Sequence, residues 1–349
     1  MRLVFITQSV DPADPVLAAT VPKIAALAER VKEVAVLAQR AAPAGLPPNV
    51  RVRTFGARGT LGRGLRFAEG LGAELRRRPD AIVAHMIPLY AILAAPVARP
   101  LGVRLVLWYT HWNAHPLLRV AERAVDAVVT VDRRSFPLPS TKVRPIGHGI
   151  DLRDFPCREN GGDPDPALRV LALGRYSPAK GLPVVLHALR DAVDAGLDAR
   201  LEAHGSSGNE LERGHRRELG RLVDQLGLGE RARLGGPLPR ADLPDLFARM
   251  DVLVNNMRAG APDKVVYEAC AGCLPVLASN PVFDELFAGL EPPLHFVRES
   301  PRELARRLTT FAALDDAARV RLGRALRERV ETGHSVGSWA DGVVAAATR

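Results

Sequence analysis

Short apolar segments alternate along this chain with longer segments in which apolar residues recur every three or four positions. Short segments rich in Val, Ile and Leu predict buried strands, and the longer periodic segments predict helices that cover them. Alternating strands and helices are typical of a parallel sheet with helices on its faces. The alternation stops at a polar stretch rich in Gly and Pro, Cys157–Pro166, and restarts at Leu168. The pattern therefore predicts an α/β protein with two parallel-sheet domains.

We expect a first domain over residues 1–150, a linker over 151–166, a second domain over 167–332 and a C-terminal helical tail over 333–349. The predicted strands are Leu3–Thr7, Val34–Leu37, Val50–Thr54, Ala81–Ala84, Leu105–Tyr109, Ala127–Val131, Lys142–Pro145, Val170–Leu173, Ala199–Ala203, Ala232–Leu234, Val252–Val254 and Val276–Ala278. The predicted helices include Pro22–Arg30, Gly64–Arg77, Leu182–Ala195, His215–Leu226, Ala241–Arg249, Val265–Ala271 and Ser338–Thr348. Ligands of such folds bind at the carboxyl ends of the strands, so functional residues should follow them directly.

Two apolar segments have some features of targeting or membrane signals. The first, Leu3–Thr7, is too short for a signal peptide. The second, Ala81–Ala98, approaches the length of a spanning helix, but His85, Pro88 and Pro96 interrupt it. A strand, a loop and a short helix fit this segment better, so we expect a soluble cytoplasmic protein.

The three cysteines are too few, and odd in number, for a disulfide framework, which favours a reducing compartment. Cys270 and Cys273 form a CxxC pair. In a redox protein that spacing would open a helix after a strand, whereas here it falls at the end of a predicted helix. We therefore expect these two cysteines to serve packing.

Basic residues are concentrated in the first half of the chain. The net charge is +9, but residues 1–150 hold 21 basic and 10 acidic residues, a net +11, and the remainder has a net −2. With only five Lys, the preference for Arg fits codon bias, which does not explain the imbalance between the halves. The imbalance indicates an anionic partner for the first half: a membrane surface, nucleic acid or a phosphorylated substrate. Arg76–Arg78 fit either a solvated helix end or a patch for anionic lipid headgroups.

The second half opens with RVLALGRYSPAKGLPVVLHAL, in which a strand ends at Gly174 and a short loop carries Arg175 and Lys180 before a helix. Two cations beside a helix N-terminus form an anion site, because the helix end adds partial positive charge and free N–H groups. Arg175 can bind phosphate with two hydrogen bonds, and Lys180 acts as a point charge. The alternative is a pair of solvated loop cations.

A second motif, VLVNNMRAGAPDKVVYEACAGCLPVLAS, places Asp263 as the N-cap of a helix that starts near Lys264. Glu268 lies about one turn inside that helix. A buried Glu at this position can accept hydrogen bonds from two sugar hydroxyls. The alternative is that Glu268 is a solvent-exposed acid of a surface helix. The apolar neighbours Val265, Val266 and Ala269 argue against that alternative.

Together these motifs resemble those of a retaining GT-B glycosyltransferase of the large family four. The resemblance is carried by GRYSPAKG, LGGPLPRADLPDLFARMDVLV and DKVVYEACAGCLPV in the second half, with GHGID at the domain junction. In the first half, DAIVAH and VRLVLWYTHW are similar in their residue pattern to segments of this family, but they match it less closely. The resemblance implies two Rossmann-like domains that face a cleft, the first for the acceptor and the second for a nucleotide-sugar donor.

The resemblance also implies roles for residues of the second domain. Directly after Gly174, Arg175 and Lys180 stand at the basic pair that grips the donor diphosphate. Glu268 stands at the glutamate that usually holds the nucleotide ribose. Leu238 falls where a backbone contact to the nucleobase is usual.

One departure from the family pattern concerns the donor site. The family's first glutamate should fall eight positions before Glu268, where this chain has Gly260. Contacts from that glutamate to donor hydroxyls are therefore missing. We expect Asp263 and Lys264 to replace part of that network.

The acceptor side is defined less closely by the resemblance. His111, in WYTHW, stands at the histidine near the donor sugar and the reaction centre. The Gly-Gly loop often seen after the first strand is absent, and TQSVDPADP stands there with Asp11 and Asp14. His85, at a strand end, and Trp112, beside His111, are further candidates for acceptor contacts.

The resemblance implies transfer with retention of configuration and without an obvious enzymic nucleophile. Arg175, Lys180 and helix N-termini would stabilise the departing diphosphate, whose oxygen could deprotonate the acceptor, while His111 orients the donor sugar. We expect a UDP- or GDP-sugar as co-substrate, with no cofactor and no metal. The one Asp-x-Asp, Asp163 and Asp165, falls in the linker between and beside prolines.

Two other functions fit parts of the sequence pattern. A nucleotide-sugar 2-epimerase would need carboxylates and a histidine arranged for base chemistry at the sugar ring, and Arg175, Lys180 and Glu268 argue against it. A non-catalytic nucleotide-sugar-binding protein is the third candidate, because of Gly260. For the enzyme we expect a lipid-linked or saccharide acceptor in cell envelope polysaccharide synthesis. The basic first domain would contact anionic membrane at the inner face, and we expect no nucleic acid partner.

Overall fold

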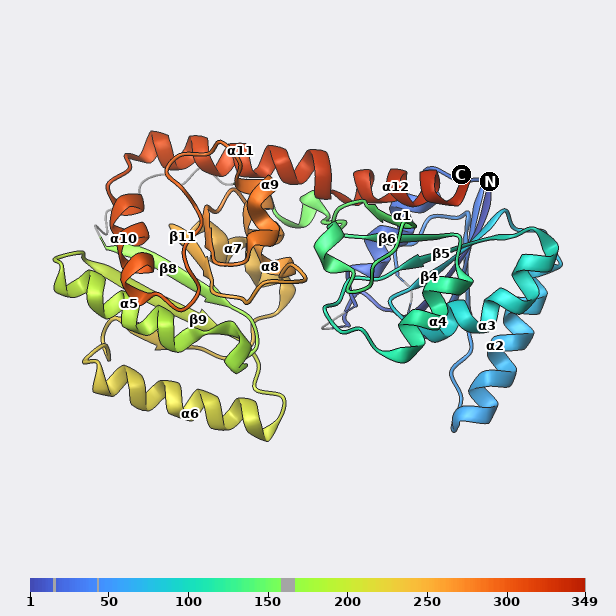
Figure 1. The fold of residues 1–349 in the computed structure, drawn as a ribbon, viewed down its shortest axis with the longest axis horizontal. Helices are drawn as coiled ribbons and strands as arrows, with labels where there is room; N and C mark the ends of the chain where they lie inside the picture. The colour runs from blue at the N-terminus through green and yellow to red at the C-terminus, as the bar shows by residue number, and fades with distance from the viewer. Residues whose placement is uncertain (15–16, 43, 158–166, 349) are drawn as a thin grey trace. The chain divides into compact units, whose positions relative to one another are not determined.

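The computed structural model describes residues 1–14, 17–42, 44–157 and 167–348 (Figure 1). The chain divides into two compact units. Unit 1 consists of Met1–Asp151 together with Gly333–Arg349, and unit 2 of Leu152–Thr332. The C-terminal residues, expected to form a separate tail, therefore group with the first unit. Most of the expected linker lies outside the described residues.

Unit 1 is built on a seven-stranded sheet in the order β3-β2-β1-β4-β5-β6-β7. Every neighbouring pair of strands is parallel. The strands are β1 (Arg2–Val10), β2 (Glu33–Ala41), β3 (Val50–Thr54), β4 (Ala81–His85), β5 (Arg104–Trp108), β6 (Ala127–Thr130) and β7 (Val143–Pro145). The α-helices are α1 (Thr20–Ala28), α2 (Thr60–Leu75), α3 (Pro88–Ala98), α4 (Pro116–Ala124) and α12 (Val336–Thr348), with short 3-10 turns at η1 (Arg99–Leu101) and η2 (Arg133–Ser135).

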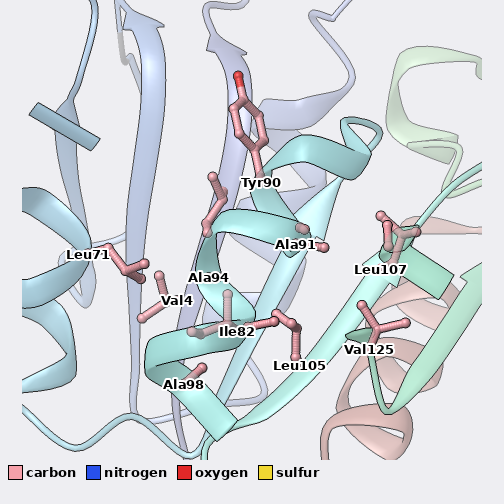
Figure 2. Close-up of a cluster of buried hydrophobic side chains, with 14 of the residues drawn as sticks. Val4, Leu71, Ile82, Tyr90, Ala91, Ala94, Ala98, Leu105, Leu107 and Val125 are labelled. Atoms are coloured by element: carbon pink, nitrogen blue, oxygen red, sulfur yellow. The ribbon is translucent and has the colours of Figure 1, made fainter. Parts of the chain in front are cut away.

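Helices cover both faces of this sheet. The connections from β3 to β6 all run in one direction across the sheet, and right-handed crossovers place α2, α3 and α4 on the same face. Their inner sides pack on alternate strand residues in one buried cluster (Figure 2). Its members include Val4, Leu71, Ile82, Tyr90, Ala91, Ala94, Ala98, Leu105, Leu107 and Val125. The first helix, α1, packs against α12, which also contacts β4, β5 and β6.

The segment that approached the length of a membrane span folds as a strand, a loop and a helix, as predicted. All five residues of β4 are buried, so each of their faces is covered. Pro88 stands at the start of α3, where its missing N–H costs no helix hydrogen bond. Within the described ranges, none of the helices is both long and apolar enough to cross a bilayer.

Helix α12 is anchored on unit 1 by a buried tryptophan. The Trp339 ring is fully buried and meets Trp108 edge-on, with 5.6 Å between ring centroids. The Lys23 ammonium lies over both rings, 4.8 Å from Trp108 and 5.1 Å from Trp339. Gly149, at φ +77°, packs against this group, and a Cβ there would come within 2.6 Å of the Lys23 side chain. Trp108 therefore packs the core of unit 1 and does not flank a ligand site.

Unit 2 has a five-stranded parallel sheet in the order β10-β9-β8-β11-β12. The strands are β8 (Leu168–Leu173), β9 (Ala199–His204), β10 (Ala232–Leu234), β11 (Val252–Asn255) and β12 (Val276–Ala278). The α-helices are α5 (Leu182–Asp194), α6 (Glu210–Gln225), α7 (Leu243–Ala248), α8 (Lys264–Ala271), α9 (Asp284–Phe287), α10 (Pro301–Ala312) and α11 (Asp316–His334). The 3-10 turns are η3 (Leu152–Asp154), η4 (Pro178–Lys180), η5 (Arg240–Asp242) and η6 (Pro281–Phe283).

The expectation of unbonded cysteines is wrong for two of the three. Cys157 and Cys273 form a disulfide, although 116 positions separate them in the sequence. Cys273 follows α8 at φ +61°, and its Cα lies 5.1 Å from that of Cys157, within the range that a disulfide requires. Cys270 is free and buried, and burial raises the pKa of its thiol above the ordinary range. Cys270 alone therefore has the expected packing role.

Candidate active site

A pocket lies at the carboxyl ends of β8, β9 and β11 in unit 2. It is lined by Ala172, Leu173, Gly174, Tyr176, Lys180, Leu182, Ala203, His204, Val254, Asn255 and Asn256. Three polar atoms in this lining are buried and have no hydrogen-bond partner: His204 Nδ1, Asn255 Oδ1 and Asn256 Oδ1. Because unpaired buried polar groups are costly, these atoms mark a place where a polar ligand or water would bind. Sequence reasoning had not selected either asparagine.

The loop after β8 brings Lys180 across the end of the sheet. Gly174 has φ +135°, and a Cβ there would lie 2.5 Å from Lys180 Nζ. Next to it, a Cβ at Gly205 would lie 1.9 Å from the Gly174 carbonyl oxygen. The two glycines therefore allow the lysine side chain and the loop after β9 to approach the end of β8 closely.

Lys180 is already paired with a carboxylate. Its ammonium donates to Asp263, whose Oδ2 also accepts a 2.8 Å hydrogen bond from Asn255 Nδ2. The Asp263 side chain makes no capping hydrogen bond to α8, so the expected N-cap role of that side chain is wrong. Its backbone still stands at the N-cap position, while its carboxylate fixes the lysine beside the pocket.

Arg175 does not join Lys180 in one cluster of contacts. Its guanidinium donates to Glu212 Oε1 at 2.9 Å, and the other oxygen of Glu212 accepts from the Gly208 backbone N–H at 2.8 Å. The Glu212 carboxylate is buried, whereas about two thirds of the Arg175 side chain is exposed. Arg175 is therefore held at its guanidinium by Glu212, while most of its side chain stays open to solvent. Sequence reasoning had missed Glu212, which lies in the first turn of α6.

Glu268 is buried and lies between two cations. Lys264 Nζ is 2.7 Å from Glu268 Oε1, and Arg240 donates to the same oxygen. Burial by itself would raise the pKa of this carboxyl, but Lys264 and Arg240 outweigh burial and hold the pKa below its ordinary value of 4.5. The arginine also pairs with Asp154 at 3.2 Å. Sequence reasoning had not selected Arg240, although it lies within the segment LGGPLPRADLPDLFARMDVLV that carries the resemblance.

We expect this cluster to make stability depend on pH in the acid range. The folded pKa of Glu268 is lowered, so its contribution is present above pH 4.5 and is lost as the pH falls through the folded value. The difference in melting temperature between the native protein and Glu268→Gln should be largest near neutral pH and should shrink below pH 4.5. Glu218→Gln, at an exposed acid of α6, is the matched control and should show a small difference with little pH dependence. If the difference in melting temperature between the native protein and Glu268→Gln stays constant on acidification, the stabilising role of this charge cluster is contradicted.

Two other predicted donor-site positions lie in loops. Leu238 is half-buried between β10 and η5, three positions beyond Gly235. Gly260 has φ +130°, a conformation that favours glycine, and its carbonyl accepts from Asn280 Nδ2 at 3.4 Å. The position where the family has a glutamate therefore has a backbone conformation that an acidic residue would adopt only with strain.

His111 and Trp112 form an exposed pair on unit 1. Their rings stack with centroids 5.4 Å apart and planes 24° from parallel. The His111 Nδ1 atom accepts from the Asn113 backbone N–H at 3.0 Å, which leaves Nε2 to carry the proton of a neutral ring. Partial burial and the nearby His115 lower the pKa of His111, so the ring favours the neutral state.

The other residues proposed for the acceptor side have structural contacts. Asp11 accepts from the Ala13 N–H at 2.8 Å within the turn after β1. Asp14 is buried, accepts from the Leu17 N–H at 2.9 Å and pairs with Arg40 at 3.2 Å. His85 is buried, with Nδ1 3.1 Å from the Thr7 hydroxyl.

Burial lowers the pKa of His85 well below its ordinary value, and the nearby Lys23 acts in the same direction. The ring is therefore neutral and enclosed at the end of β4. The position of His85 at a strand end predicted a side chain open to a ligand. The structure shows a buried one instead. The Asp163 and Asp165 pair lies outside the described residues.

Comparison with known proteins agrees with this architecture. Residues 157–329 match the family described as Glycosyl transferases group 1. Spore coat protein SA of Bacillus subtilis (strain 168) is 26% identical over 303 residues, 76% of this chain and 78% of that protein. The sucrose-phosphate synthase of Thermosynechococcus elongatus has a TM-score of 0.75 at 18% identity, covering 99% of this chain and 98% of that one. The HepE protein of Anabaena, solved with UDP and glucose, has a TM-score of 0.74 at 17% identity, covering 99% and 98%.

The fold class predicted from the sequence is confirmed. The two parallel-sheet units, with sheets of seven and five strands, form a GT-B fold. The matched domain identifies the protein as a glycosyltransferase, and the fold is consistent with that class. The segment that matches Glycosyl transferases group 1 covers nearly the whole of unit 2.

Proposed function

We propose that this glycosyltransferase moves a sugar, with retention of configuration, from a UDP- or GDP-sugar to a lipid-linked or saccharide acceptor. The single observation that carries the proposal is the pocket at the strand ends of unit 2, with Lys180 beside three unpaired buried polar atoms. A structural relative, HepE, was solved with UDP and glucose, which supports a nucleotide-sugar donor. We assign the product to cell envelope polysaccharide synthesis, and the enzyme to the cytoplasm in peripheral contact with the inner membrane face.

In the proposed reaction the critical need is to stabilise charge on the departing diphosphate. Lys180, held by Asp263, supplies fixed positive charge beside the pocket, and the start of α5 adds its helix dipole. The Arg175 side chain is largely exposed, and Glu212 binds only its Nη1 atom, so we assign the other guanidinium N–H groups to a phosphate oxygen. We assign His111 to orientation of the donor sugar, and a diphosphate oxygen to deprotonation of the acceptor.

For the remainder of the donor we assign the ribose to the carboxylate of Glu268. Lys264 and Arg240 occupy one oxygen of that carboxylate, Oε1, and a diol could bind the other. We assign a backbone contact with the nucleobase to Leu238. The proposed chemistry needs no cofactor and no metal, because protein cations and helix ends provide the positive charge.

The experiment that tests this function is incubation of the whole protein with UDP-, GDP- and ADP-sugars, followed by product analysis. A transferase should release the nucleotide slowly by hydrolysis and faster when an acceptor is added. An epimerase would interconvert the sugars instead. A binding protein would raise its melting temperature with the nucleotide and release nothing. Gly260 and the paired state of Lys180 keep the binding protein as the second candidate.

Nucleotide binding should also stabilise the fold measurably. A ligand at 100 times its dissociation constant stabilises the folded state by about 2.7 kcal/mol. We therefore expect UDP or GDP to raise the unfolding temperature of unit 2 by several degrees. Because all three tryptophans lie in unit 1, their fluorescence should report little of this shift, whereas circular dichroism should report it. If none of the nucleotides changes the thermal unfolding curve, a donor site in unit 2 is contradicted.

A further inference from the structure

The outer face of the helical layer α2–α3–α4 is apolar. In the described part of the chain, eleven large hydrophobic side chains are exposed, and eight of them lie on these helices or on η1. The eight are Leu61, Leu65, Leu89, Leu93, Val97, Leu101, Leu117 and Val120. We call this set the outer apolar face. The three helices lie next to one another beneath the sheet of unit 1 (Figure 1).

Helix α3 has an unusual distribution of residue sizes. Its core side carries four alanines, Ala91, Ala94, Ala95 and Ala98, together with Tyr90, and Figure 2 shows three of these alanines within the buried cluster. Its outer side carries Leu89, Leu93 and Val97 at intervals of four residues, each at least 42% exposed. An ordinary surface helix has large apolar residues inside and charged residues outside. The sequence of α3, PLYAILAAPVA, has no charged residue.

Arginines border the outer apolar face. Arg58 and Arg66 are exposed at the start of α2, Arg99 at η1, and Arg119 and Arg123 on α4. Across α2, α3 and α4 only one acid, Glu69, is exposed. Aliphatic side chains flanked by arginines match the surface of a bilayer. The aliphatic side chains can pack among the acyl chains, and the arginines can bind the anionic headgroups.

We propose that the outer apolar face docks unit 1 on the surface of an anionic lipid bilayer. This gives the peripheral membrane contact proposed above a definite surface, and it does not depend on the donor chemistry. Helix α3 has only 11 residues, so it lies in the interface and does not cross the membrane. The group Arg76–Arg78 lies at the other end of α2, and one of its members is engaged, since Arg77 pairs with Glu33 at 3.2 Å and its carbonyl accepts from Arg2.

Charge distinguishes the bilayer from other occupants. A two-fold dimer through this face would place the arginines of one copy against those of the other, which is unfavourable. Single-stranded nucleic acid binds through aromatic side chains on which bases stack, whereas the eight residues of this face are all aliphatic. An anionic bilayer provides apolar contacts for the leucines and negative charge for the arginines.

The test is co-sedimentation of the full-length protein with vesicles of phosphatidylcholine and with vesicles of phosphatidylcholine and phosphatidylglycerol. We expect binding to the anionic vesicles only, weakening as salt increases. The variant Leu89→Gln/Leu93→Gln should bind at least about tenfold more weakly. Arg119→Ala/Arg123→Ala should lose about as much. The matched control is Leu211→Gln, because Leu211 is 70% exposed on α6 of unit 2 and should not affect binding.

Donor hydrolysis in solution is measured for the same variants and should not change, so failure of membrane binding and failure of the proposed enzyme can be distinguished. Tryptophan fluorescence confirms that unit 1 remains folded. Binding that ignores lipid charge would overturn the proposal, as would leucine variants that bind like the native protein. A concentration-dependent dimer that the leucine changes abolish would also overturn it, and would assign the face to a second copy.

Discussion

Replacing Lys180 with alanine should lower turnover of the nucleotide-sugar donor by about 10²–10³-fold, or roughly 3 kcal/mol of barrier. The ammonium is the one cation in the lining of the pocket, and 18% of its side chain is exposed. Its charge is therefore little screened by water and acts where the diphosphate is expected to depart. The measurement is the steady-state rate of nucleotide release with the best donor and acceptor. Lys32→Ala, at an exposed lysine of unit 1, is the matched control and should have no effect.

The partner of Lys180 makes this prediction sharper. In Lys180→Ala the carboxylate of Asp263 stays in a half-buried position without its cation, which could itself distort the site. The double variant Lys180→Ala/Asp263→Asn removes that charge and should recover stability but not turnover. If the double variant turns over the donor normally, the loss came from the unpaired carboxylate, and Lys180 does not stabilise the leaving group.

Replacing Trp339 with alanine should destabilise unit 1 by about 3–5 kcal/mol. The ring is fully buried against Trp108 and Lys23, so its removal leaves a cavity and uncovers a buried ammonium. Thermal unfolding followed by tryptophan fluorescence reports unit 1 alone, since the remaining tryptophans, Trp108 and Trp112, both lie there.

Trp112→Ala provides the matched control, because it removes the same side chain from a position that is 56% exposed. We expect that variant to unfold within about 1 kcal/mol of the native protein. Equal effects from the two substitutions would show that α12 contributes little to the stability of unit 1. The unfolding of unit 2 should be unchanged in both variants.

The alternation of strands and helices was predictable because burial on both faces leaves a clear apolar pattern. In β4 all five residues are buried, and the following Pro88 indicates where α3 begins. The ends of β1 were harder to predict, since the strand continues through Gln8 and the buried Ser9 to Val10. Polar residues within a strand look like its end when only hydropathy is considered.

The helices α10 and α11 were not predicted. Their composition is strongly polar, and each presents only a narrow buried stripe to the unit. In α11 the buried residues are Gly323 together with Leu322, Leu326 and Val330, which recur at intervals of four residues. That spacing was a usable signal for a helix.

The partners of the site residues could not be predicted from the sequence. Positions 180 and 263 pair across 83 residues, 175 and 212 across 37, and 240 and 268 across 28. The motifs identified the cations and Glu268, because those residues follow strands or open helices. Only the packing of one helix against another shows that each of these charges is already balanced by an opposite one. The Cys157–Cys273 bond was unpredictable for the same reason.

The division of unit 1 into two segments has a consequence for the order in which the chain becomes structured during synthesis. Unit 2 is continuous from Leu152 to Thr332, so all of it is synthesised before Trp339 is added to the chain. Until then Lys23 and Trp108 lack their covering ring, and the first unit to be synthesised is the last to be completed. A fragment that stops at Asp151 would expose that surface, whereas unit 2 can be cut from the gene as a single piece. The unit that one continuous gene fragment encodes is therefore the unit expected to hold the donor site.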